Sequence, residues 1–290
     1  MDGILIIDKP DGITSHDVVS RVRRILKTKR VGHTGTLDPF ATGVMVILVG
    51  QATRLAQFLD KDEKEYEADI KFGFETDTGD RTGTQKAVGS RQKAVTSEEV
   101  DVVLSKFRGE IEQTPPMYSA KKIGGQKLYE LARKGETVER KAVKVTISKL
   151  ELVDTEKFRI RVACSSGTYI RTLAEDIGRK VGVGAHLAEL RRTRAGRFDL
   201  SRSLTLDALA ALDDPTTALL SMEEAVEHLP SITLTAERAA KTRSGLSTRL
   251  MEITFPEGQP VRMLDECDKL LAIGFYDETE KSIRPKVVLV

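Results

Sequence analysis

The chain has 290 residues, of which 40% are hydrophobic and 31% are charged. This composition excludes a disordered or fibrous protein, and the length favours one large domain with a small second one. With 46 Lys and Arg against 44 Asp and Glu, the net charge of +2 is too small to indicate a nucleic-acid partner by itself.

The N-terminus and the two cysteines both bear on the cellular location of the protein. Residues 1–8 contain four consecutive apolar residues and no basic leader, which predicts a strand and neither a signal peptide nor a membrane span. Cys164 and Cys267 follow no metal-ligand or redox spacing, so we expect both to be reduced and structural. These features predict a cytoplasmic protein.

A helix is predicted after the first strand. Ser15 is the expected cap, and Val18, Val22 and Ile25 follow the spacing of one buried face. The outer face and the residues beyond it are strongly basic, and they comprise Arg21, Arg23, Arg24, Lys27, Lys29 and Arg30.

A polar loop, residues 32–39, leads into the continuous apolar run 44–49, which predicts a fully buried strand. An Asp-Pro pair such as Asp38-Pro39 is usually only a turn. Here the loop also contains a histidine and two threonines beside a buried strand, so Asp38 is a candidate nucleophile or base that needs no metal. His33 has three interpretations: a core histidine, a general base, or a flat ring that fills the gap left by a base flipped out of its stack.

Alternating polarity over residues 66–72 predicts a half-buried strand with Tyr66 on its apolar side. Tyr66 is therefore either a core side chain or a part of a site. Further along, Thr96 and Glu99 form a capping box ahead of a helix whose apolar positions are Val100, Val103, Leu104 and Phe107.

Residues 118–141 form a basic segment with glycine hinges at 124, 125 and 135. This predicts a mobile arm that suits nucleic acid, although a solvated surface segment explains the same charges. Its cations are Lys121, Lys122, Lys127, Arg133, Lys134, Arg140 and Lys141.

Arg171 lies in the first turn of a helix predicted to begin at Ile170, after an alternating strand over 158–164. A cation there opposes the helix dipole at a cost of about 0.3–1 kcal/mol. Glu175, one turn later, is one possible partner, worth at most about 0.5 kcal/mol. A buried carboxylate such as Asp38 is the other, and an ion pair with it would keep the acid ionised and oriented.

Strand patterns separated by turns follow Pro230, for example over residues 270–276 and 287–290, and they indicate a small β-rich terminal domain. Strands and helices are mixed without a repeating βαβ unit. We therefore predict an α+β fold with a mixed, largely antiparallel sheet.

Several motifs of the chain together resemble the bacterial TruB family of tRNA pseudouridine synthases from end to end. The opening motif spans residues 8–17, and the long, gap-free aspartate motif spans residues 32–43. Shorter matches surround Tyr66 (64–66), the start of the arm (116–120) and Arg171 (167–173), and two more lie at 184–187 and 190–193.

The resemblance implies a function and a set of roles. The chain would isomerise uridine 55 in the TΨC loop of tRNA to pseudouridine by flipping the base, with Asp38 as the catalytic aspartate paired to Arg171. Tyr66 would stack on the base and move a proton, His33 would replace the flipped nucleotide, and the pocket would be shaped by Lys9, Tyr169 and Leu190.

The resemblance also implies the organisation of the molecule. It implies a catalytic domain over 1–229 with an inserted thumb at about 118–141, and a PUA-like RNA-binding domain over 230–290. No cofactor and no metal are expected. The expected partner is the tRNA T arm, with no membrane and no obligate protein partner, and the protein is expected to be a monomer.

Three alternatives stay open from the sequence. A guide-RNA-dependent pseudouridine synthase shares the aspartate loop but works with partner proteins. A non-catalytic chaperone would fold tRNA by holding its elbow, and a hydrolase would release free uracil.

Overall fold

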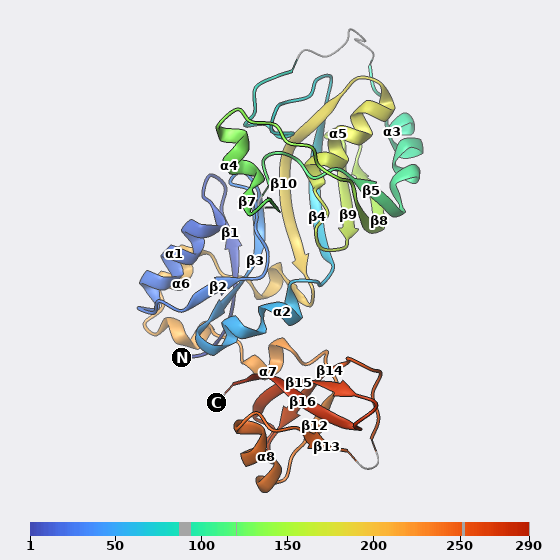
Figure 1. Ribbon diagram of the computed structural model, residues 1–290. Coiled ribbons are helices and arrows are strands. Elements are labelled where there is room, and N and C mark those ends of the chain that lie inside the picture. Colours follow the sequence, from blue (N-terminus) through green and yellow to red (C-terminus); the bar gives the residue numbers. More distant parts are fainter. Residues whose placement is uncertain (87–93, 120, 251–252, 290) are drawn as a thin grey trace.

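The computed structural model describes the chain except for residues 87–93, 120, 251–252 and 290. Two large sheets and a short hairpin, flanked by helices, make up the fold (Figure 1). The α+β prediction is confirmed. Among the described residues, no helix combines the length and the apolar character needed to cross a membrane.

The larger sheet has nine strands, in the order β1-β3-β10-β4-β9-β8-β5, with β2 beside β3 and β11 beside β10. Its described pairings are antiparallel, apart from the parallel contact between β3 and β10. The bounds are β1 (Gly3–Lys9), β2 (Val31–His33), β3 (Thr42–Val49), β4 (Lys64–Phe72), β5 (Gly109–Gln113), β8 (Val143–Asp154), β9 (Arg159–Cys164), β10 (Ala185–Ala195) and β11 (Phe198–Asp199).

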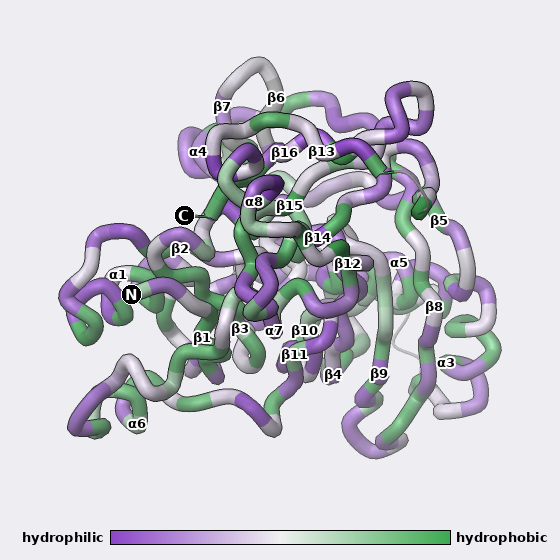
Figure 2. Tube along the Cα trace, turned by 90° about the horizontal axis from the view of Figure 1, so that it is seen from below, coloured by the Kyte–Doolittle hydropathy of each residue, from purple (hydrophilic) through white to green (hydrophobic). Residues whose placement is uncertain are grey.

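The helices bury their apolar faces against this sheet. Leu173 and Ile177 of α5 (Ile170–Val181) and Val100 and Leu104 of α3 (Ser97–Leu104) enter the core over β4, β9 and β10. Val18 and the other apolar positions of α1 (Ser15–Ile25) pack on β1 and β3, and Figure 2 shows hydrophobic and hydrophilic stretches alternating along α1. Outside the arm, the other helices of the described residues are α2 (Ala56–Leu59), α6 (Leu206–Ala210), α7 (Met222–Ala225) and α8 (Ala236–Arg243), with 3-10 turns at Gly50–Leu55, Ser105–Phe107, Leu200–Arg202 and Pro215–Ala218.

Helix caps show where local sequence was informative. The capping box of Thr96 and Glu99 is confirmed. The cap predicted at Ser15 is wrong by one residue, because Thr14 caps α1 through a box with Asp17. The Ser15 hydroxyl is buried and serves another segment, since it both accepts from the Leu37 amide and donates to the Leu37 carbonyl.

The strand predicted over 158–164 begins one residue later. Phe158 has φ of 49° and lies in the turn before β9, where its ring packs edge-on against Phe72. Similarly, Phe107 falls in a 3-10 turn after α3, although it still packs against the core.

The arm forms a small unit of its own. A hairpin of β6 (Lys122–Ile123) and β7 (Gln126–Lys127) is followed by α4 (Leu128–Arg133). At the two roots of the arm, the Tyr118 carbonyl accepts a hydrogen bond from Arg171 of α5, and Arg140 donates to the Pro115 carbonyl at 2.9 Å.

The second sheet has five strands in the order β12-β14-β15-β16-β13. They are β12 (Ser231–Thr233), β13 (Thr248–Arg249), β14 (Pro260–Leu264), β15 (Leu270–Asp277) and β16 (Ser282–Val288). This sheet agrees with the strand patterns predicted after Pro230. Val290, the last residue of the predicted strand 287–290, lies outside the described residues. Cys267 is exposed whereas Cys164 is buried, so the structural role expected for both cysteines is wrong for Cys267.

One apolar cluster spans both sheets. Ile4, Val44 and Leu55 from the N-terminal part pack in the same cluster as Ile273 and Val287 from the second sheet. The proposed domain boundary near residue 230 therefore crosses a continuous core.

Candidate active site

The loop that carries Asp38 is held to the larger sheet by hydrogen bonds from the end of β1. Lys9, at the end of β1, is fully buried, and its ammonium donates to the carbonyls of Pro10, Pro39 and Ala41 at 2.7–2.9 Å. Together with the Ser15–Leu37 bonds, these contacts fix the backbone on both sides of Asp38. Burial lowers the pKa of Lys9 to about 8.

Arg171 on α5 meets Asp38 in a two-point ion pair. Its Nε lies 2.8 Å from Oδ2 and its Nη2 lies 3.1 Å from Oδ1. The arginine side chain is only 5% exposed and the aspartate side chain 31% exposed, so the carboxylate is the part open to a substrate. The structure thus brings Asp38 and Arg171 together, and Glu175 forms ion pairs with Lys86 and Arg179 instead.

Three further acceptors hold the same guanidinium. Nη1 donates to the Thr78 carbonyl at 2.8 Å, Nη2 donates to the Tyr118 carbonyl at 2.7 Å, and the buried Asp80 carboxylate lies 3.9 Å from Nη1. Asp80 is itself fixed by the hydroxyl of Thr78 and the amide of Thr82, both at 2.9 Å. The sequence analysis missed Asp80, because the polar run 75–83 reads as an ordinary turn.

The pKa of Asp38 is raised above its ordinary value. Burial is the main cause, and the negative charge of Asp80 adds to it, while Arg171 and Lys9 act in the opposite direction. The pair with Arg171 favours the ionised form, as expected, but desolvation outweighs it in setting the direction of the shift. A raised pKa makes Asp38 a stronger base than a free aspartate.

Tyr66 and Leu190 lie on adjacent strands, β4 and β10, and share one apolar cluster with Leu37 and Phe40 of the aspartate loop. Tyr66 is buried, and that burial raises the pKa of its phenol. The charge of Asp38 also acts on this phenol, so Tyr66 lies within electrostatic range of the carboxylate.

His33 and Tyr169 lie in the chain just before the two segments that carry Asp38 and Arg171. His33 ends β2, and burial followed by the charges of Arg192 and His16 lowers the pKa of its ring, which keeps it neutral at pH 7. Its Nδ1 is buried without a hydrogen-bond partner in the described part of the chain. Tyr169 immediately precedes α5, and the amide of the buried Gln113 binds its backbone at 3.0 and 3.3 Å.

Arg192 on β10 is the second residue that the sequence analysis missed as part of the site. It is 2% exposed, and it donates to the carbonyls of Val44 at 2.7 Å and Gly35 at 3.2 Å, one on each side of the aspartate loop. It lies opposite Tyr66 in the β4–β10 register, and its charge acts to lower the pKa of that phenol. Gly43 follows the loop with φ of 101°, and a side chain there would collide with the Arg192 backbone.

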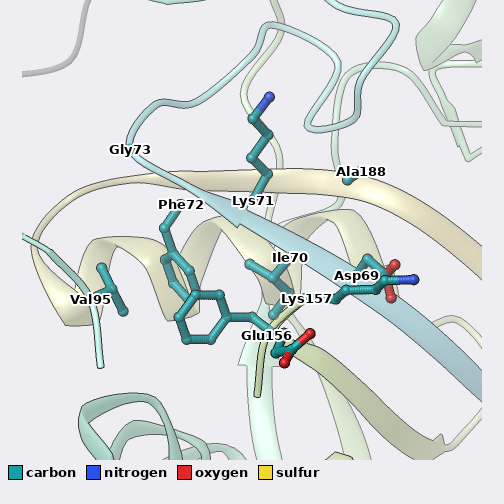
Figure 3. Close-up of a pocket in the computed structure, with 10 residues that line it drawn as sticks. Asp69, Ile70, Lys71, Phe72, Gly73, Val95, Glu156, Lys157 and Ala188 are labelled. Atoms are coloured by element: carbon teal, nitrogen blue, oxygen red, sulfur yellow. The ribbon is translucent and has the colours of Figure 1, made fainter. Parts of the chain in front are cut away.

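A separate cavity of about 470 Å³ lies between β4 and the β8–β9 turn (Figure 3). Its lining is mainly aliphatic and aromatic, with the charged ends of Lys71, Glu156 and Lys157 at its margin, and its Asp69 is bound to Arg159 at 2.5 and 2.9 Å. Its lining includes none of the candidate site residues. Across the described residues, no group of three or more His, Cys, Asp and Glu side chains could hold a metal ion.

Comparison with known proteins defines the class. Residues 23–170 match the N-terminal domain model of the TruB family of pseudouridylate synthases, and residues 171–227 match the C-terminal domain model of tRNA pseudouridylate synthase B. The protein is thus a pseudouridylate synthase, an isomerase.

Individual relatives narrow the class to one family. The tRNA pseudouridine synthase B of Bacillus pumilus is 44% identical, with 100% of this chain and 98% of the relative covered. The enzyme of the same name from Stutzerimonas stutzeri is 43% identical, with 96% and 92% covered. The chain therefore belongs to the TruB family.

The fold is also similar to solved structures. A chain in the crystal structure of a Cbf5-Nop10-Gar1 complex is 28% identical with a TM-score of 0.77, and the match covers 99% of this chain and 85% of the other. A chain in the structure of an H/ACA RNP bound to a substrate RNA containing 2'-deoxyuridine gives 27% and 0.77 with the same coverage.

Proposed function

We propose that this protein converts uridine 55 in the TΨC loop of tRNA to pseudouridine, with Asp38 as the catalytic residue. The observation that carries the proposal is the two-point pair between Asp38 and Arg171, in which the arginine is buried and the carboxylate is open. Relatives at 43–46% identity are named tRNA pseudouridine synthase B, which supports tRNA as the substrate.

The reaction breaks the bond between N1 and C1′ of the uridine, turns the uracil, and joins C5 to C1′, after which the C5 proton is lost and N1 regains one. No atom is gained or lost overall. Asp38 either attacks C1′ or the uracil ring, or removes the C2′ proton. Arg171 holds the carboxylate at one orientation through both oxygens, so little reorganisation is needed when charge develops.

A base in a folded loop has to leave its stack before it reaches Asp38, at a cost of a few kcal/mol. Tyr66 would stack on the extruded uracil above the apolar cluster that includes Leu190. His33, neutral and aromatic, would occupy the gap in the RNA, and Tyr169 would complete the pocket. Lys9 acts from beneath the loop as a positioning residue, because it is fully buried.

The organisation proposed with this function has three parts. Residues 1–229 form the catalytic domain, the arm at 118–141 holds the T arm, and residues 230–290 are a PUA-like RNA-binding domain. The protein works as a monomer in the cytoplasm without an obligate protein partner.

The test is to treat an unmodified tRNA transcript with the purified chain and map pseudouridine along it. We expect one pseudouridine at position 55, an unchanged RNA mass, and no product from a transcript with cytidine at that position. Free uracil would establish a hydrolase instead, RNA refolding without product would establish a chaperone, and activity only with a guide RNA and partner proteins would place the chain with the guide-dependent enzymes.

A further inference from the structure

One segment of the chain has an extreme charge that the catalytic site does not use. Residues 18–37 contain six Lys and Arg and no Asp or Glu, in a chain whose total charge is only +2. The segment covers most of α1 and the whole of β2, and ends one residue before Asp38.

None of these six cations forms an ion pair with a carboxylate of the described residues, and two of them bind uncharged oxygens. Arg23 donates to the Val31 carbonyl and Arg30 to the Thr53 hydroxyl. Arg21, Arg24, Lys27 and Lys29 are exposed, and no carboxylate of the described residues forms an ion pair with them within 4.0 Å. These four residues are called the α1 basic face below.

Some exposed cations of the larger sheet are paired with carboxylates. Arg161 binds Glu67 at 2.8 Å and Arg194 binds Glu63 at 2.7 Å, and the arginine side chains are 39% and 33% exposed. Acidic residues are thus available to the fold as surface partners. Near the α1 basic face, the Asp17 carboxylate interacts electrostatically with Arg21, but it accepts its hydrogen bonds from the amide and the hydroxyl of Thr14. Like charges on neighbouring turns repel one another, so the arrangement favours an anionic ligand over an empty surface.

The α1 basic face is rigidly tied to the catalytic loop at both ends. The first residue of α1, Ser15, bonds the Leu37 backbone, and β2 ends at His33. From Ser15 to Arg24 the helix rises about 14 Å, so Arg24 lies within about three turns of α1 from the residue that contacts the aspartate loop. In both ribbon and tube views, α1 lies on the flank of the sheet's β1 side, where arm helix α4 also lies (Figures 1 and 2).

We propose that the α1 basic face binds the sugar–phosphate backbone of the tRNA next to the loop whose uridine enters the site. The proposal rests on the proposed function. A phosphate backbone offers a row of negative charges along one direction, and the four cations form a strip along the helix and its exit. The apolar side chains of α1 are buried against β1 and β3, which leaves a charged face suited to phosphates and no apolar edge for a membrane.

The experiment compares two full-length variants with the wild type, using an unmodified tRNA transcript as the probe. The test variant carries Arg21→Gln, Arg24→Gln and Lys29→Gln; Lys27 is kept because its φ of 51° makes its backbone a separate variable. The matched control carries Lys106→Gln, Lys157→Gln and Lys180→Gln, which removes the same charge from exposed positions outside α1 that likewise form no ion pair with a carboxylate of the described residues. Circular dichroism melts verify that each variant is folded.

For the test variant, we expect the Kd for the transcript to rise at least about tenfold at roughly 0.1 M salt, and the slope of log Kd against log salt to fall by about 2 to 3. The turnover number at saturating RNA should equal that of the wild type, and the control variant should bind like the wild type. Equal losses in both variants, or an unchanged salt slope in the test variant, would overturn the inference. If the wild type forms no pseudouridine, the proposed function fails instead.

Discussion

The cations around Asp38 and those on the α1 basic face differ in their exposure to solvent. Lys9, Arg171 and Arg192 are almost fully buried, and each binds two or more carbonyl or carboxylate oxygens. Burying a charge without such partners is strongly unfavourable, so these bonds are a condition of folding. The α1 cations remain in water and need no partner for stability, which leaves their charge available to RNA.

The comparison separates two kinds of effect. Loss of a buried group should lower turnover and stability with little change in affinity, whereas loss of an exposed α1 cation should do the reverse.

Replacement of Asp38 by asparagine should abolish turnover. The amide keeps the size of the side chain and one acceptor oxygen, but neither attacks carbon nor accepts a proton efficiently. Quantified pseudouridine in a single-turnover assay should be at background, while the Kd for tRNA stays near that of the wild type. Substantial product from this variant would exclude Asp38 as the catalytic residue.

Replacement of Arg171 by alanine should lower kcat by about 10²- to 10³-fold, the range for loss of one preorganised charged donor in an active site. The variant leaves Asp38 and Asp80 without their shared cation, so the pKa of Asp38 should rise further. Steady-state kinetics should show a much smaller change in KM. A kcat equal to that of the wild type would show that the pair is only structural.

Replacement of Arg192 by methionine should reduce both stability and kcat. It removes the donor of the Val44 and Gly35 carbonyls, and each buried acceptor left unpaired costs about 1–3 kcal/mol. We expect a Tm several degrees lower, with lysine at this position recovering part of the loss because it can reach one carbonyl. An unchanged Tm would mean that the loop is fixed by Lys9 and Ser15 alone.

Replacement of Asp80 by asparagine should change the pH dependence more than the fold. The negative charge of Asp80 raises the pKa of Asp38, so its removal should lower that pKa. Because the ionised form of Asp38 acts and is lost as the pH falls through its pKa, the acidic limb of the kcat profile should move to lower pH. A limb that stays in place would show that burial alone sets the pKa.

Helices and strands are predicted well from the sequence where the pattern of their own residues determines the structure. The apolar run of β3, the buried stripe of α1 and the capping box of α3 are all local signals, and each is present in the structure. The position of Arg171 at the start of α5 was also readable, and its conflict with the helix dipole pointed to a partner outside the helix.

Long-range partners were not readable. Asp80 reaches Arg171 across 91 positions, and nothing in the run 75–83 distinguishes that aspartate from a turn residue. Arg192 lies in an arginine-rich stretch of β10, and only the strand order, with β10 between β3 and β4, shows that its side chain enters the core. Ser15 was mistaken for a cap because its true acceptor, Leu37, lies 22 residues away.

The apolar cluster shared by the two sheets has a consequence for how the molecule comes apart. Ile4 and Val44 lose their neighbours Ile273 and Val287 if the last sixty residues detach. Separation of the two sheets would therefore expose apolar side chains of both to water. The two sheets therefore contribute to one shared free energy of unfolding. On heating, they should unfold as a single cooperative unit.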